Sequence, residues 1–230
     1  MKEFAVVIPA YRPKHNLPQY VNRLIQQDVA QVIVVNDGND KKYDGLFNEL
    51  ARFERCTVLY HESNRGKGAA LKTGFHHYLG HYSKYAGVVT ADADGQHLVK
   101  DVLSVGRHLE RRQSDFILGV RKFERKEMPA RSFIGNTLTS LVFKGLSGMY
   151  IADTQTGLRG LATAELTWVV RLKGNHFEFE MNMLMNMINK NKRIVRVDIE
   201  SVYEEEHISY FETYKDSLRI ARQMFKEYLS

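Results

Sequence analysis

Residues 87–97 read Gly-Val-Val-Thr-Ala-Asp-Ala-Asp-Gly-Gln-His, a short apolar run that ends in two aspartates one residue apart. The apolar part shows no alternation of polar and apolar residues, which predicts a strand buried on both faces. Other short apolar runs precede it at residues 4–8, 32–35 and 58–60. Segments with helical signals separate the runs. We therefore predict an α/β fold with a mostly parallel central sheet and helices on both of its faces.

The sequence also indicates where other elements lie. Asn16 can cap a helix that carries Pro18 in its first turn. The second half of the chain is less regular. There we expect strands near residues 116–120 and 194–197, helices near 133–149, 177–190 and 214–229, and a turn-rich segment at 153–160.

Length and composition limit the possible classes of protein. A chain of 230 residues suits one domain with a single core. The only cysteine, Cys56, cannot form an internal disulfide, so we expect a reducing compartment. No stretch reaches the roughly 18 apolar residues of a membrane span. The net charge of +6 favours anionic partners but does not choose among phosphates, lipids and nucleic acid.

Chemically versatile side chains follow each of the first four predicted strands. In a doubly wound sheet the ligand crevice lies beyond the carboxyl ends of the strands, so these segments should meet at one edge. They are Pro9-Ala10-Tyr11, Asn36-Asp37-Gly38, Asn64-Arg65-Gly66-Lys67-Gly68 and Asp92-Ala93-Asp94-Gly95-Gln96-His97.

Asp92 and Asp94 form the most specific of these patterns. Two carboxylates separated by one residue can share Mg²⁺ or Mn²⁺ with a diphosphate, because these ions take oxygen ligands and keep positions open for phosphate oxygens. Gln96 could add a carbonyl oxygen. The alternative is a polar turn with a helix cap, which is the commoner explanation of an isolated Asp-x-Asp. The strand-end position favours the metal hypothesis.

Two further segments have both a binding and a structural interpretation. Asp37 could accept a hydrogen bond from a nucleoside, or simply form a turn in Asn-Asp-Gly. Residues 64–68 place Arg65 and Lys67 at a predicted helix start, where free N–H groups favour an anion. Alternatively, they form a flexible turn with solvated charges.

Several motifs, taken together and in this order, resemble glycosyltransferase family 2 and, within it, the polyprenyl- and dolichyl-phosphate sugar synthases. The resemblance covers essentially the whole chain. The motifs are VVIPAYRP (6–13), VVNDG (34–38), NRGKGAALKTG (64–74), DADGQH (92–97), DTQTGLRG (153–160), FEFEMNML (177–184) and DSLRI (216–220).

The resemblance implies a GT-A fold and transfer of a sugar, with inversion, from a UDP- or GDP-sugar to a polyprenyl phosphate. It divides the single domain into a Rossmann-like nucleotide-sugar-binding half (1–97), an acceptor-binding and catalytic half (98–213) and a basic amphipathic helix (214–230). Relatives of this kind often continue into membrane-spanning segments, so a membrane domain or partner outside this chain is expected.

The resemblance also implies roles for individual residues. Pro9, Tyr11 and Asp37 would line the nucleoside, with Lys67 on the donor side. Asp92, Asp94 and Gln96 would serve the metal and the diphosphate. Arg121, Arg131 and Arg159 would hold the acceptor phosphate, and Asp153 would position the donor or act as a base. Two departures from the family pattern concern the acceptor side: Gly135 stands where a serine is expected, and residues 208–211 read Ile-Ser-Tyr-Phe in place of Ser-His-Phe.

Basic residues indicate where the protein would act. Residues 121–131 contain a run of lysines and arginines, which is either a solvated face or a site for lipid phosphate. Residues 214–230 could pack on the domain or lie on an anionic membrane. We expect a cytoplasmic protein, peripheral on the inner face of the membrane. We expect no nucleic-acid partner, because interleaved aromatic and basic residues are not evident.

Other functions remain possible from the sequence. One is a family 2 transferase that acts on a sugar hydroxyl of a glycan, and another is a non-catalytic module that binds a nucleotide sugar. A nucleotidyltransferase or a dinucleotide oxidoreductase would carry a glycine-rich loop after the first strand, where this chain has Pro-Ala-Tyr-Arg-Pro.

Overall fold

The central element is a seven-stranded sheet. The computed structural model describes residues 3–27, 29–112, 115–121, 140, 144–145, 148, 150–151 and 153–200. In this part of the chain the strand order is β3-β2-β1-β4-β6-β5-β7. The strands are β1 (Ala5–Ala10), β2 (Gln31–Asp37), β3 (Cys56–His61), β4 (Gly87–Thr90), β5 (Phe116–Arg121), β6 (Arg159–Ala162) and β7 (Ile194–Ile199).

One strand reverses the direction of the sheet. β6 pairs antiparallel with both β4 and β5, whereas the other pairings are parallel. The carboxyl ends of β1, β2, β4 and β5 therefore lie at the same edge as the residues that precede β6. The expectation of a mostly parallel sheet is confirmed.

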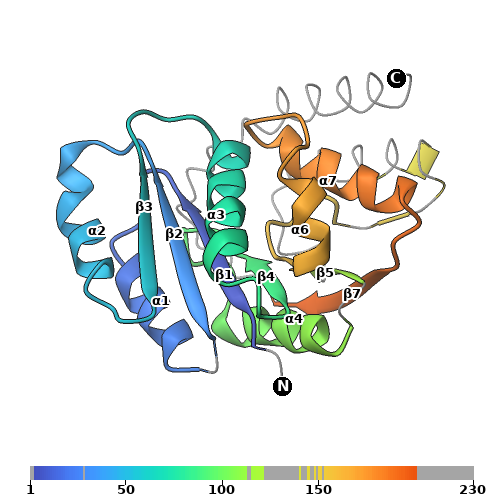
Figure 1. Cartoon of the computed structure of the whole chain (residues 1–230), viewed down its shortest axis with the longest axis horizontal. Coiled ribbons are helices and arrows are strands. Elements are labelled where there is room, and N and C mark those ends of the chain that lie inside the picture. The colour runs from blue at the N-terminus through green and yellow to red at the C-terminus, as the bar shows by residue number, and fades with distance from the viewer. Residues whose placement is uncertain are drawn as a thin grey trace, which may run out of the picture.

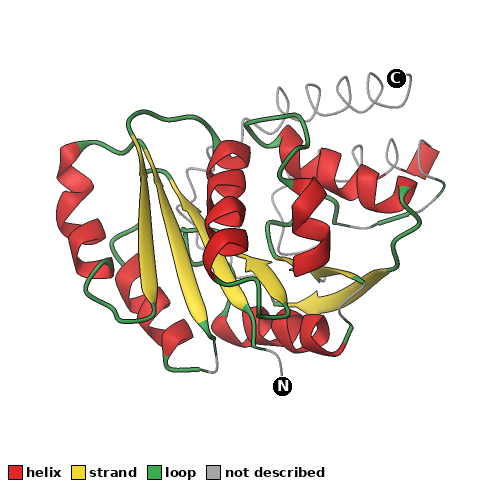
Figure 2. Cartoon of the chain, viewed as in Figure 1, coloured by secondary structure: helices red, strands yellow, loops and turns green. Residues whose placement is uncertain are grey.

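Helices cover both faces of the sheet (Figures 1 and 2). On one face, α1 (Leu17–Ile25), α2 (Asp44–Leu50) and α4 (Val99–Arg111) enclose one apolar cluster. On the other face, α3 (Lys67–His81), α6 (Thr163–Val169) and α7 (Glu178–Asn189) enclose a second. A short 3-10 helix, η1 (Lys41–Tyr43), precedes α2. No helix in the described ranges is long and apolar enough to cross a membrane.

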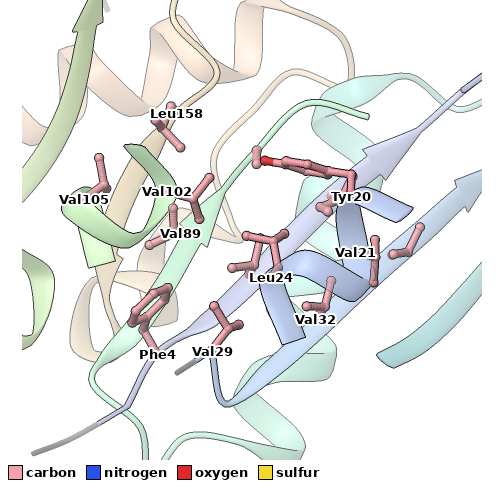
Figure 3. Close-up of a cluster of buried hydrophobic side chains, with 14 of the residues drawn as sticks. Phe4, Tyr20, Val21, Leu24, Val29, Val32, Val89, Val102, Val105 and Leu158 are labelled. Carbon is pink, nitrogen blue, oxygen red and sulfur yellow. The ribbon is translucent and has the colours of Figure 1, made fainter. Parts of the chain in front are cut away.

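Side chains of the central strands explain the two clusters. Successive residues of β1 point to opposite faces. Val6 and Ile8 enter the first cluster, whereas Ala5 and Val7 enter the second. Figure 3 shows Phe4, Leu24, Val89 and Val102 in the first cluster. The strands are buried on both faces, which is why their sequences show no alternation.

The structure differs from the sequence-based expectations in two respects. The segment expected as turns at 153–160 is a loop up to residue 158, but its last two residues begin β6, which α6 follows. The β6 residues Arg-Gly-Leu-Ala include no β-branched side chain, so they carry no strand signal. Asn16 precedes α1 but its side chain makes no capping hydrogen bond, because the residue already has helical backbone angles. Most of the helix expected near 133–149, and all of the one expected near 214–229, lies outside the described residues.

Two glycines of α3 test how closely this helix packs on β1. A Cβ added to Gly74 would lie 2.5 Å from Cγ1 of Val7, which is fully buried. Gly74→Ala should therefore lower the free energy of unfolding by about 1–3 kcal/mol, as overpacked cores do. Gly80 has no atom within 4 Å of an added Cβ. Gly80→Ala should raise stability by roughly 0.5–1 kcal/mol through helix propensity alone. Urea unfolding measures both, and equal effects would contradict the close packing.

Candidate functional site

The polar segments predicted from the sequence meet at the carboxyl edge of the sheet. Asp92 follows β4, and Lys67 begins α3 after β3. The segment before β6 joins them there, because Thr90 Oγ1 donates to the carbonyl oxygen of Gly157 over 2.6 Å. A Cβ added to Gly157 would lie 2.5 Å from Asp92 Oδ2. Chain segments more than 60 residues apart thus surround the Asp92 carboxylate.

Lys67 lies between two carboxylates. Its Nζ is 2.8 Å from Asp92 Oδ1 and 2.9 Å from Glu180 Oε2. The other oxygen of Asp92 is 3.2 Å from His97 Nε2. The Lys67 side chain is only 16% exposed and also lies against the Phe177 ring. The expected donor-side lysine therefore contacts the expected metal-binding aspartate directly.

These contacts keep Asp92 and Lys67 charged. Burial opposes ionisation of Asp92, but the Lys67 ammonium and the contact with His97 outweigh it and hold the pKa of this carboxyl well below its usual range. Burial also opposes protonation of Lys67, but Asp92 and Glu180 raise its pKa above the ordinary value. Asp92 is therefore a carboxylate, and Lys67 an ammonium, throughout the neutral pH range.

Asp94 and Gln96 flank the same segment. Asp94 Oδ1 accepts a hydrogen bond from the Gln96 backbone N–H over 3.0 Å, and both side chains are half-buried. In the described part of the chain no three His, Cys, Asp or Glu side chains converge as a metal cage. Mg²⁺ is commonly bound by one or two carboxylates together with substrate phosphates. Asp92, Asp94 and Gln96 supply the oxygen donors that such a cation prefers, and both Asp92 oxygens also contact protein, at Lys67 and His97.

Asp37 closes the loop between β3 and α3. Its Oδ1 is 2.6 Å from His61 Nδ1 and 2.9 Å from the Arg65 N–H, and its Oδ2 accepts from the Gly66 N–H over 2.9 Å. His61 Nε2 is in turn 2.9 Å from Thr73 Oγ1. Asp37 is 2% exposed. Its contact with a nucleoside stays a prediction, whereas its role as a clamp on this loop follows from the geometry.

Several N–H groups at the start of α3 already have protein partners. Besides Arg65 and Gly66, the Ala69 N–H donates to the Asn175 carbonyl over 2.9 Å. These groups are therefore engaged, and the expected anion site depends more on the Lys67 side chain than on the helix terminus.

Asn39 ties together the loops that follow β1 and β2, and the sequence analysis missed it. Its Nδ2 donates to the Ala10 carbonyl over 2.8 Å and to Asn36 Oδ1 over 2.7 Å, and its Oδ1 accepts from the Arg12 N–H. Pro9 and Tyr11 lie beside this junction, half-buried. The signal that could have found Asn39 is the ability of Asn in Asn-Asp-Gly-Asn to bond to neighbouring backbone.

Arg121 and Asp153 form a two-point ion pair at the end of β5. Arg121 Nε is 2.6 Å from Asp153 Oδ2, and its Nη2 is 2.9 Å from Oδ1. The Asp153 side chain is fully buried, whereas 21% of the Arg121 side chain is exposed. This forked geometry fixes the guanidinium plane. Arg131, expected beside Arg121, lies outside the described residues.

Arg159 has a different place from the one expected. It is 1% exposed, and its guanidinium donates to the carbonyl oxygens of Thr154, Thr156 and Glu180. These bonds brace the segment before β6 against α7. An arginine enclosed in this way does not present its guanidinium to an acceptor phosphate, so the assignment of Arg159 to that phosphate is not retained.

Glu180 is a second residue to which the sequence analysis assigned no role. It is 5% exposed, and its Oε1 is a buried oxygen without a hydrogen-bond partner in the described part of the chain. The Tyr20 hydroxyl is the other such atom, and the charges of Asp92 and Asp94 help to raise its pKa after the larger effect of burial. Tyr20 is thus close enough to both aspartates for their charges to act on it, and Glu180 shares the Lys67 ammonium with Asp92.

Comparisons with known proteins agree with this geometry. The family model of glycosyl transferase family 2 matches residues 5–155. The UDP-N-acetylglucosamine–dolichyl-phosphate N-acetylglucosaminyltransferase of Methanococcus voltae is 28% identical over 219 residues, which cover 87% of this chain and 86% of that protein. The polyprenol monophosphomannose synthase of Mycolicibacterium smegmatis is 27% identical over 204 residues, which cover 84% of this chain and 75% of that protein.

A solved structure gives the same fold. Glucosyl-3-phosphoglycerate synthase from Mycobacterium tuberculosis, in complex with Mn²⁺, uridine diphosphate and phosphoglyceric acid, superposes with a TM-score of 0.68 at 16% identity. The match covers 97% of this chain and 76% of that one. The fold is therefore of the GT-A type. Since the family model spans more than half of the sequence, this chain belongs to glycosyl transferase family 2 and is a glycosyltransferase related to the dolichyl- and polyprenyl-phosphate sugar transferases.

Proposed function

We propose that the protein transfers a sugar from a UDP- or GDP-sugar to a polyprenyl phosphate at a membrane surface, in a reaction that depends on Mg²⁺ or Mn²⁺. The observation that carries the proposal is the placement of Lys67 against Asp92 at the carboxyl edge of the sheet, with Asp94 beside it. The names of the two relatives above support the choice of a lipid phosphate acceptor.

The donor would bind over the ends of β1, β2 and β4. Pro9, Tyr11 and Asp37 lie on the side assigned to the nucleoside, and Asp92, Asp94 and Gln96 would hold the divalent cation together with diphosphate oxygens. When bound, this cation offsets negative charge on the leaving diphosphate. Lys67 adds a fixed positive charge beside it, and such preorganised charge is usually the largest contribution to catalysis.

The reaction is a displacement at the anomeric carbon. An oxygen of the acceptor phosphate forms the new bond to this carbon while the bond to the nucleoside diphosphate breaks, with inversion. A phosphate monoester has a second pKa of about 6 and is largely anionic at neutral pH, so the acceptor needs no general base. Asp153, which is buried with both oxygens bound to Arg121, is then a positioning residue for Arg121.

Arg121 would bind the acceptor phosphate, with Arg131 from the same basic segment. A guanidinium that is locked in plane suits two-point binding of phosphate. The basic residues of 121–131 and 214–230 would face the anionic inner leaflet of the membrane, where each cation near the surface contributes about 1 kcal/mol.

The overall reaction is tested by a transfer assay. We expect a glycosylated lipid when the protein is incubated with Mn²⁺, a short polyprenyl phosphate in detergent, and UDP-glucose, UDP-N-acetylglucosamine or GDP-mannose in turn, with mass spectrometry as the readout. Chelation with EDTA should stop the reaction. A soluble glycan acceptor is the control. Turnover with the glycan but not with the lipid would replace this proposal by a sugar-hydroxyl transferase.

Asp94→Asn tests the metal assignment. Replacement of the carboxylate removes a hard ligand and its charge, so Mn²⁺-dependent release of the nucleoside diphosphate should fall by about 100-fold or more. Asp44→Asn changes an exposed aspartate at the start of α2 and is the matched control. Undiminished turnover in the Asp94 variant, with an unchanged fold by circular dichroism, would refute the assignment.

Arg121→Lys tests the acceptor side. Lysine keeps the charge opposite Asp153 but loses the planar fork, so KM for polyprenyl phosphate should rise about tenfold, equivalent to about 1.4 kcal/mol, with little change in KM for the donor. Arg196→Lys, at an exposed position of β7, is the control. A defect confined to the donor KM would contradict the role of Arg121.

A further inference from the structure

The two glutamates at the start of α7 have different surroundings. Glu178 Oε1 accepts hydrogen bonds from the N–H groups of Asn175 and His176, which is a complete structural explanation for this residue. Glu180 makes no such bonds to its own turn. Its Oε2 lies 2.9 Å from Lys67 Nζ, across the contact between α3 and α7.

The contact between the two helix starts is close and fixed. A Cβ added to Gly68 would lie 2.5 Å from Cβ of Phe179, so the backbone of α3 touches the side-chain base of its neighbour. The hydrogen bond from Ala69 N–H to the Asn175 carbonyl holds the same junction. The position of Glu180 relative to Lys67 is therefore set by backbone packing.

A lysine side chain has a flexible four-carbon stem and needs external contacts to hold its ammonium in one place. Asp92 on one side and Glu180 on the other supply them, over 2.8 and 2.9 Å. An ammonium has three N–H donors. Two of these serve the carboxylates in the described part of the chain, which leaves one for a substrate.

A role for Glu180 in binding Arg159 does not explain these contacts. Glu180 Oε1 is 3.9 Å from Arg159 Nε, beyond hydrogen-bond distance, and that nitrogen donates to the Thr156 carbonyl. Oε1 therefore has no hydrogen-bond partner among the described residues, although its charge still acts on the Arg159 guanidinium. Of the two cations beside Glu180, Lys67 is therefore the one within hydrogen-bond distance of its carboxylate.

We propose that Glu180 is a positioning residue for sugar transfer: it holds Lys67 so that the remaining N–H donor of the ammonium faces the diphosphate of the nucleotide sugar. This inference rests on the proposed function. In this proposal Lys67 contacts the diphosphate. Glu180, on a helix about 110 residues further along the chain, orients the Lys67 ammonium.

Steady-state kinetics test the inference first. Glu180→Gln should lower kcat about tenfold or more with little change in the donor KM, since a contact with the leaving group strengthens in the transition state. Glu180→Asp, which keeps the charge on a shorter side chain, should recover part of the loss. Glu178→Gln removes a charge from the same turn and should leave kcat unchanged. An unchanged kcat in Glu180→Gln would overturn the proposal. If the glutamine variant does not fold, the kcat of Glu180→Asp is the measurement that decides.

A double-mutant cycle separates positioning from general damage. If Glu180 acts through Lys67, the double variant of Lys67→Met and Glu180→Gln should be no slower than Lys67→Met alone. Losses that multiply would show that Glu180 acts independently of the lysine.

A spectroscopic readout does not require turnover. In ¹⁵N-lysine-labelled protein without substrate or metal, an ammonium held by two carboxylates should give a resolved NH₃⁺ signal that exchanges slowly at low temperature. Lys67→Met assigns the signal, and Glu180→Gln should remove or shift it while Glu178→Gln does not. No such signal in the unmodified protein, or an unaltered one in Glu180→Gln, would overturn the inference. Failure of the unmodified protein to glycosylate lipid would instead refute the proposed function.

Discussion

The Lys67 ammonium connects three parts of the chain that are distant in sequence: the start of α3, the end of β4 and the first turn of α7. Its contacts with Asp92 and Glu180 are made where water is largely excluded. Buried ion pairs are weak contributors to stability, because the cost of removing charges from water offsets much of their attraction. We therefore interpret the two contacts as fixing the position of the Lys67 ammonium rather than as stabilising the fold. The glycines at 66 and 68 serve the same arrangement, since side chains there would collide with the residues that precede and begin α7.

The reversal of β6 has an equally direct consequence for the site. A strand that runs opposite to β4 and β5 begins where its neighbours end. The residues before it, 153–158, are thereby brought to the carboxyl edge of the sheet. This places Asp153 beside the last residue of β5 and Gly157 against Asp92. A fully parallel sheet with the same helices would have left this segment at the opposite edge.

The sequence predicted the parts of the molecule that depend on local patterns. Val6, Ile33 and Val88 lie in uninterrupted apolar runs, and the strands predicted from these runs were confirmed. The polar segments that follow the strands also meet at one edge of the sheet, as expected. β6 was missed because four residues that include glycine carry no strand signal, and its pairing partners are far away in the chain. Glu180 and Asn39 were missed for a related reason. A charge at a helix start and an asparagine in a turn each have a sufficient local explanation, and only tertiary contacts give them a further one.

Charge balance around Asp92 bears on how the two anionic substrates of the proposed reaction would meet here. The side chains gathered at this edge include four carboxylates, at Asp92, Asp94, Asp153 and Glu180, against three cations, at Lys67, Arg121 and Arg159. Each cation lies beside at least one carboxylate, so this set alone does not attract a diphosphate and a phosphate together. A divalent cation beside Asp94 would change the net charge of these side chains from negative to positive. The basic residues of 121–131, most of which lie outside the described part of the chain, would add charge on the acceptor side. The proposed dependence on metal is then an electrostatic requirement of the reaction as much as a property of the Asp-Ala-Asp motif.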